Sequence, residues 1–252
     1  ILESRQIVTE RLDQARDDLP QRAGVPQLGP ITSIMGEIEF FGIRASEGAS
    51  LMLAREVADW QLEPQLLAIP GVANVTALGG DIREYQVLVS PDRLQEMHIG
   101  LDQVREAASR ANRNAGGGWI SEGGQDYVLR FIGRTQQASD LAEAVITVRD
   151  DAPIRIRHVA EVREGPGIPI GDGGINGDPG VIVAVSKQPN ADTLELTRRI
   201  KAVLQEAQAD LPEGIHLEPG LFRQADFISR AIDNVAVALR DGAIFVVVVL
   251  FA

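Results

Sequence analysis

Apolar side chains recur at helical spacing along the first part of the chain, with charged residues between them. Pro20 and a glycine–proline turn end this pattern, so we expect a helix over 2–19. The stretch ITSIMGEIEFFGIRA is rich in β-branched and aromatic residues and predicts a strand over about 31–45. Strict alternation along that strand would place two sets of side chains on opposite faces: Met35, Glu37 and Glu39 on one, and Ile34, Ile38 and Phe40 on the other.

The next segments alternate between helical and strand patterns. A helix is expected over about 50–69, with Pro64 inside it as a kink or break. Strands at 72–78 and 83–89 flank Gly79-Gly80-Asp81, an arrangement that predicts a β-hairpin. A further helix is expected at about 101–113. Beyond it, short strands lie between two glycine clusters, NAGGGWISEGGQDY and GIPIGDGGINGDPG.

One unit recurs three times: a helix ends in Leu-Pro or Ile-Pro, a glycine follows, and a strand comes next. The copies are ARDDLPQRAG, LLAIPGV and AQADLPEGI. Such repetition suggests split βαβ units, in which helices lie on antiparallel or mixed sheets. The sequence therefore predicts an α+β fold with ferredoxin-like subdomains and a β-rich insert.

The end of the chain permits two interpretations. An amphipathic helix from Phe227 to Leu239 leads into residues 243–252, which contain no polar side chain. Ten apolar residues cannot span a bilayer, which takes about 20 in a helix. The run is either a buried strand of a self-standing soluble α+β binding or assembly module, or the first half of a transmembrane helix.

Composition excludes several classes of function. The formal net charge is −12, and Arg198, Arg199 and Lys201 form one of only two short basic runs, so nucleic-acid binding is not expected. With no cysteine, the chain has no disulfides, thiol catalysis or thiolate metal sites. The chain opens without Met and already in a helical pattern, so we expect a fragment of a longer protein.

No catalytic constellation is visible. The three histidines lie far apart without metal-ligand spacing, and no phosphate-binding or calcium loop has its required residues. We therefore expect a protein that is not an enzyme and needs no cofactor. The face with Met35, Glu37 and Glu39 is a possible cation surface, because oxygen ligands suit hard cations and a thioether suits soft ones. A solvated strand face is the alternative.

The order of the motifs resembles the RND (resistance–nodulation–division) efflux transporters, most of all the heavy-metal Czc/Cus-type branch. The resemblance rests on IPGV, GG before EYQV, P-x-R-L, EGGQDYVLR, IRIRHVAEVREGP, INGDPGVIV, LPEGI and AIDN, and covers the whole chain. It implies a proton-driven homotrimer in the inner membrane of a Gram-negative bacterium, mostly periplasmic in this segment. Its implied partners are a periplasmic adaptor (membrane fusion) protein, an outer-membrane channel and a metal cation substrate.

The resemblance also implies a domain plan. Residues 1–44 would be the last part of a first porter subdomain, and 45–114 with 179–222 a second, discontinuous one. Residues 115–178 would be a docking insert, and 223–252 the lead-in and first half of a transmembrane helix. The insert is short between Asn114 and Tyr127, so the long arm that links protomers in the drug-exporting branch is not expected.

Strand positions and the resemblance together give candidate substrate-cleft residues: Met35, Glu37, Glu39, Thr76 and Leu78. The family's metal-binding methionines and proton-relaying acids fall outside this chain, so the metal ligands are unknown. Export of organic compounds is an open alternative, although a low aromatic content of 4% favours cations.

Overall fold

The computed structural model describes residues 2–20, 24–32, 34–46, 48–112, 115–122, 125–131, 135, 137–169 and 171–251. The chain forms two compact units: residues 1–80 with 171–252, and residues 81–170. The second unit is thus an insertion in the first. The docking insert expected at 115–178 stays a prediction, because these two units are defined by compactness alone.

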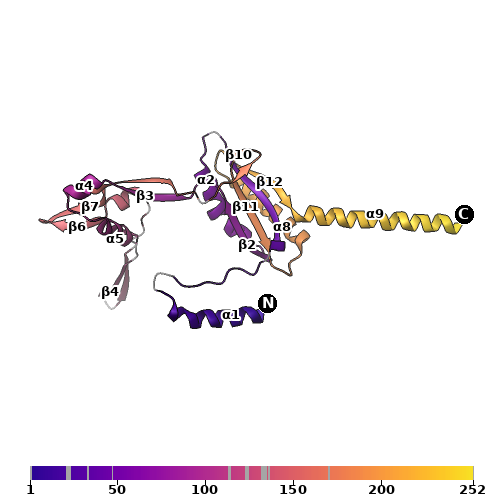
Figure 1. Ribbon diagram of the computed structural model, residues 1–252, viewed down its shortest axis with the longest axis horizontal. Helices are drawn as coiled ribbons and strands as arrows, with labels where there is room; N and C mark the ends of the chain where they lie inside the picture. Colours follow the sequence, from indigo (N-terminus) through magenta and orange to yellow (C-terminus); the bar gives the residue numbers. More distant parts are fainter. Residues whose placement is uncertain are drawn as a thin grey trace. The chain divides into compact units, whose positions relative to one another are not determined.

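The first unit carries the longer helices and the larger sheet (Figure 1). Its elements are α1 Leu2–Ala15, η1 Arg16–Asp18, η3 Ile34–Gly36, β1 Glu37–Ala45, α2 Leu51–Glu56, η4 Val57–Leu62, α3 Glu63–Leu67, β2 Val72–Leu78, β9 Gly174–Ile175, β10 Asp178–Pro179, β11 Val181–Lys187, α8 Thr193–Ala207, η5 Gln208–Asp210, β12 Ile215–Arg223 and α9 Gln224–Phe251. The predicted helix at the start and the helices before β2 and β12 are confirmed.

A four-stranded antiparallel sheet, in the order β12-β1-β11-β2, is the centre of the first unit. Phe41 and Ile43 of β1 lie opposite Val183 and Val181 of β11, and all four are buried. The core that they form includes side chains of α2, α3 and α8, so these helices cover one face of the sheet. Each buried side chain of this size stabilises the fold by roughly 1.5–3 kcal/mol.

The other face of the sheet is covered in part by the small hairpin of β9 and β10. Its turn is Asn176-Gly177, with φ values of 55° and 94°, as a tight hairpin turn requires. Ile175 in this hairpin is 1% exposed, and a Cβ atom placed on Gly180 would lie only 2.6 Å from its Cδ1. Gly42 approaches the same side chain. Ile175 therefore covers the sheet beside Gly42, and the end of β1 near Glu37 lies outside this contact.

The helix expected over 50–69 is present, but its middle is the π-helical turn η4 between α2 and α3. In a regular α-helix the ring of Pro64 would collide with the carbonyl group four residues earlier, that of Trp60. A π turn widens the helix at this point, and Pro64 lies in the first turn of α3, where proline is tolerated. The predicted kink is thus accommodated by a change of helix type.

The predicted hairpin of 72–78 with 83–89 is wrong. β2 pairs with β11 in the first unit, whereas β3 (Arg83–Val89) pairs with β8 (Ala160–Pro166) in the second. Gly79 and Gly80 have φ values of 77° and 71°, but they do not close a hairpin turn. Gly79 lies against the backbone of Gly173 and Gly180, where the chain leaves the first unit and returns to it. Only glycine permits so close an approach.

The second unit contains short strands paired in twos and short helices. In addition to β3 and β8 it has α4 Pro91–Glu96, α5 Leu101–Ala111, β4 Ala115–Glu122, β5 Gln125–Phe131, α6 Ala138–Ala142, β6 Val145–Arg149, β7 Ala152–Arg155 and α7 Ile156–Val159. Its pairs are β3-β8, β4-β5 and β6-β7. A separate core holds it together, with Val104, Ile156 and Val159 at its centre.

Helix α9 runs without a break through the last described residues (Figure 1). The interpretation of the apolar end as a buried strand is therefore wrong. Among the described residues, α9 is the one helix long and apolar enough to cross a membrane, and that judgement rests on its length and composition. Ala225 in its first turn is buried, whereas the large apolar side chains from Phe227 to Phe251 are mostly exposed.

We expect Gly79→Ala to destabilise the first unit more than Gly48→Ala does. Both glycines have positive φ, which costs an alanine about 1–2 kcal/mol. A Cβ atom on Gly48 meets open space, but on Gly79 it would collide with backbone, at a further cost of ~1–3 kcal/mol. The measurement is the thermal unfolding midpoint in detergent by circular dichroism. Equal midpoints for the two variants would contradict the close contact.

We expect the apolar half of α9 to govern partition between water and detergent. A chain that ends at Asn234 keeps the first turns of α9, including buried Ala225, and loses the exposed apolar remainder. The shortened chain should remain in the aqueous phase of a detergent phase separation, and the full chain should enter the detergent phase. Recovery of both chains in the aqueous phase would show that α9 is not membrane-seeking.

Candidate functional site

A polar groove lies on the sheet face opposite the helices. Its volume is about 540 Å³, and its lining comes from β1, β2, β11 and the segment before β1. The lining residues are Thr32, Glu37, Asn74, Thr76, Leu78, Ala184 and Ser186. Three of the five candidate residues, Glu37, Thr76 and Leu78, therefore lie together.

Strand register explains how these side chains meet. Ser186 of β11 lies opposite Glu37 on one side and Asn74 on the other, and Ala184 lies opposite Thr76. Alternate residues of a strand point to opposite faces. The positions between them on β2 and β11, such as Val75 and Val185, consequently point into the core, where both are buried.

The expected common face of Glu37 and Glu39 is wrong. The pairing of β1 with β11 shifts between these residues: Glu37 lies opposite Ser186, but Glu39 lies opposite the core residue Val185. Such a bulge adds one residue to one strand and reverses the alternation beyond it. Glu37 is exposed at the groove, whereas Glu39 is 1% exposed.

Met35 also differs from its expected position. The strand begins at Glu37, and Met35 lies in the 3-10 turn η3 before it. Its side chain is 78% exposed and is not part of the groove lining. Its carbonyl oxygen accepts a hydrogen bond from the Gln224 side chain at 3.5 Å. Met35 therefore lies beside Gln224, the first residue of α9.

Glu39 forms a buried charged pair at the junction of β12 and α9. Its Oε1 accepts a hydrogen bond from Arg223 Nε at 3.3 Å, and its Oε2 has no partner among the described residues. Burial raises the pKa of the Glu39 carboxyl above its ordinary value of 4.5, and the Asp226 charge adds to this. The charges of Arg223 and Lys201 act in the opposite direction but do not cancel the effect of burial.

The groove offers one carboxylate, hydroxyl groups and an amide rather than a coordination cage. The described residues contain no group of three or more His, Cys, Asp or Glu side chains that could hold a metal ion. Oxygen groups of this kind attract hard or borderline cations. The arrangement suits weak, transient contact with a cation more than tight binding.

Sequence reasoning did not identify Thr32, Asn74, Ala184 and Ser186 as groove residues. Asn74 shares the alternation of Thr76 and Leu78 along β2, so the same pattern could have found it. Ser186 and Ala184 come from β11, more than a hundred positions away in the chain. Only the pairing of β11 with β1 and β2 brings them to the groove.

The fold is that of an efflux pump. The chain superposes on one crystal form of a heavy metal efflux pump with a TM-score of 0.79 and 22% sequence identity. The match covers 93% of this chain and 23% of the pump chain. A likeness at this identity shows the fold alone.

The AcrB/AcrD/AcrF family model matches residues 1–252, so this chain belongs to the AcrB/AcrD/AcrF family. It is 29% identical over 256 residues to the cobalt-zinc-cadmium resistance protein CzcA of Cupriavidus metallidurans. It is 33% identical over 252 residues to the cation efflux system protein CusA of Escherichia coli K12. Each match covers 98% of this chain, which spans about a quarter, 24%, of the length of these relatives.

We expect the buried Glu39 to make stability depend on pH. Because its pKa is raised in the folded chain, the folded state holds its proton at pH values where the unfolded state has lost it. Stability from this group is present below pH 4.5 and falls as the pH rises toward the folded pKa. In Glu39→Gln this loss of stability with rising pH should be absent. The measurement is the unfolding midpoint of both chains from pH 4.5 upward. Parallel pH profiles for the two chains would contradict the assignment.

Proposed function

We propose that this chain is the mostly periplasmic part of a proton-driven inner-membrane pump that exports heavy-metal cations. The single observation that carries this is the match of 98% of the chain to relatives named for cobalt, zinc and cadmium resistance and for cation efflux. The chain spans about a quarter of those relatives. As the family resemblance implies, the proton pathway and the metal-binding methionines would belong to other parts of such a pump.

We propose that the first unit contains a porter subdomain of the ferredoxin-like type. In support, its core elements follow the chain order β1, α2 to α3, β2, β11, α8, β12. In the strand order β12-β1-β11-β2, α2 to α3 connects β1 to β2 across β11, and α8 connects β11 to β12 across β1. This is the β-α-β-β-α-β pattern of split βαβ folds.

The second unit, residues 81–170, would then be the docking subdomain. It is inserted between β2 and β11, at the position where the family resemblance expects a docking insert. The porter subdomain would accordingly include β1, one of the two central strands of its sheet, rather than begin at Ala45. The assembled pump would be a homotrimer with an adaptor protein and an outer-membrane channel, as the family resemblance implies.

Helix α9 would enter the membrane in this arrangement. Its exposed apolar length argues against the alternative of a self-standing soluble module, because such a surface needs lipid or a partner to cover it. The first turn of α9 contacts the sheet unit through Gln224, whose side chain meets both Met35 and Thr193. Movement of α9 would thus reach α8 and η3, the turn that precedes β1, directly.

The groove would be the chain's share of the substrate cleft. Its lining contains no aromatic side chain, and the nearby Phe40 instead packs on Phe222 with ring centroids 5.4 Å apart. Flat organic substrates are held mainly by aromatic and apolar walls. The carboxylate of Glu37 and the lack of aromatic residues in this lining therefore favour a cation over the alternative of an organic substrate.

We expect Glu37→Gln, introduced into the full-length pump, to lower the metal tolerance of cells that depend on it. Loss of one exposed charge contact of 0.2–1 kcal/mol corresponds to a roughly one-and-a-half- to fivefold effect. The measurement is the minimal inhibitory concentration of cobalt, zinc, cadmium, copper and silver salts at matched expression.

Glu161→Gln is the matched control, since Glu161 is also an exposed glutamate on a strand but lies in the second unit. It should leave tolerance unchanged. If Glu37→Gln matches the wild type for every metal while the pump itself confers tolerance, the groove is not part of the substrate path.

A further inference from the structure

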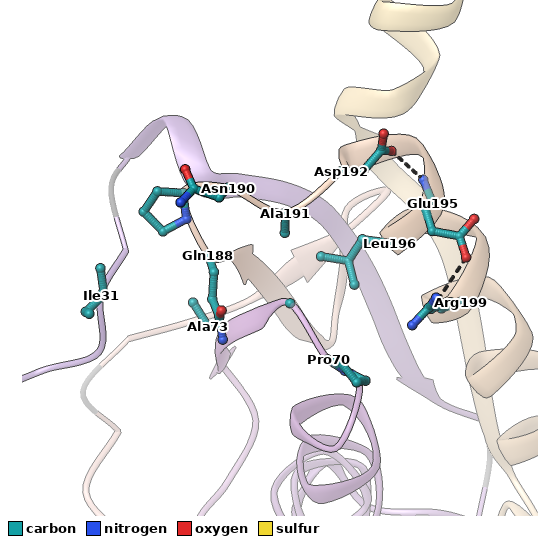
Figure 2. A pocket seen from close by; sticks show the side chains of 12 residues that line it. Ile31, Pro70, Ala73, Gln188, Asn190, Ala191, Asp192, Glu195, Leu196 and Arg199 are labelled. Atoms are coloured by element: carbon teal, nitrogen blue, oxygen red, sulfur yellow. Dashed lines mark hydrogen bonds and ion pairs between the residues drawn. The ribbon is translucent and has the colours of Figure 1, made fainter. Parts of the chain in front are cut away.

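A second, larger cavity lies at the end of the sheet unit and shares no residue with the groove. Its volume is about 650 Å³, within the range of small-molecule sites. It is bounded by the turn before β2, the loop between β11 and α8, and the first two turns of α8. Figure 2 shows the lining, which is Ile31, Pro70, Gly71, Ala73, Gln188, Pro189, Asn190, Ala191, Asp192, Glu195, Leu196 and Arg199.

One part of the cavity wall is apolar. Leu196 projects from α8 toward the loop residues, with Ala191 beside it and Pro70 across from it (Figure 2). Leu196 is nearly buried and anchors α8 to the core, so this wall is held in place by the fold. An apolar group placed here would gain roughly 25 cal/mol for each Å² removed from water.

The charged lining residues of the cavity are Asp192, Glu195 and Arg199. Arg199 is held in place by Glu195, whose Oε1 accepts from Arg199 Nε at 2.9 Å. Glu195 Oε2 lies 2.9 Å from Arg198 Nη2, so one carboxylate serves two guanidinium groups. Within the described part of the chain, the two Nη groups of Arg199 have no partner, and neither has the Asn190 amide.

The acidic groups near the cavity are already engaged. Asp192 caps α8, and its side chain accepts from the backbone N–H of Glu195 at 2.8 Å. Lys187, at the end of β11, donates to the carbonyl oxygen of Ala191 at 2.8 Å and adds a positive charge beside the loop. With Lys187 and Arg198 beside the lining, three cations stand near the two carboxylates Asp192 and Glu195, which already have partners. This leaves Arg199 as the group that can attract an anionic ligand.

We propose that this cavity binds a small amphipathic organic carboxylate, with its apolar part against Leu196 and Pro70 and its carboxylate on the free Nη groups of Arg199. A guanidinium group matches a carboxylate with two parallel hydrogen bonds, and the Nε bond to Glu195 fixes its orientation. The site does not depend on the proposed transport function, because its residues are separate from those of the groove.

The test uses the whole chain in nanodiscs of zwitterionic lipid, with empty nanodiscs as the background. The probe is 4-phenylbutyrate and the matched neutral probe is 4-phenylbutanamide, both followed by isothermal titration calorimetry. The carboxylate should bind at least about tenfold more tightly than the amide, because a charge-assisted pair is lost with the amide. Asn190→Trp, at an exposed lining position, should block binding of the carboxylate.

Two arginine variants separate the cavity from general surface charge. Arg199→Gln should weaken binding of 4-phenylbutyrate by about tenfold. Arg105→Gln is the matched control, since Arg105 is an exposed helical arginine paired to Asp102 at 3.0 Å in the other unit. It should bind the probe as the wild type does, and both variants should keep the wild-type unfolding midpoint.

Several outcomes would overturn the proposal. They are the absence of binding above the empty nanodiscs, equal affinity for the carboxylate and the amide, and equal effects of the two arginine variants. Binding of tri-glutamate as tightly as 4-phenylbutyrate would also overturn it, because that result would show a surface for acidic peptides without use of the apolar wall.

Discussion

The hydrogen-bonded pairing of β1 with β11 is the constraint on which the first unit depends. These strands are the two central members of the sheet, although more than a hundred residues separate them in the chain. Their register directs Phe41, Ile43, Val181 and Val183 into one core beneath the helices. The same register directs Glu37 and Ser186 to the opposite face. One pairing thus creates both the hydrophobic core and the polar groove.

Local patterns in the sequence predicted the helices and most strands, because capping residues, prolines and apolar periodicity act over a few residues. They did not predict which strands pair. Gly79-Gly80 resembles a hairpin turn locally, yet its glycines are needed for contact with the backbone of Gly173 and Gly180. That contact depends on residues far away in the chain. The error over the hairpin has this cause.

For the same reason, only part of the groove could be predicted from the sequence. Thr76 and Leu78 follow simple alternation along a regular strand, and the structure places both at the groove. Glu37 and Glu39 follow the same alternation in the sequence, but a bulge separates them. A bulge leaves no clear mark in a single sequence. Its effect is large, because it converts one of two similar carboxylates from a groove residue into a buried partner of Arg223.

The groove and the cavity beside α8 share no lining residue, but residues that are neighbours in the chain line both. Ala73 lines the cavity and its neighbour Asn74 lines the groove, and Ile31 and Thr32 divide in the same way. Ser186 lines the groove, and Gln188, two residues further along the chain, lines the cavity. Packed strands do not deform independently of their neighbours. A shift of β2 at its first residues, or of the end of β11, must therefore alter the shape of both sites together.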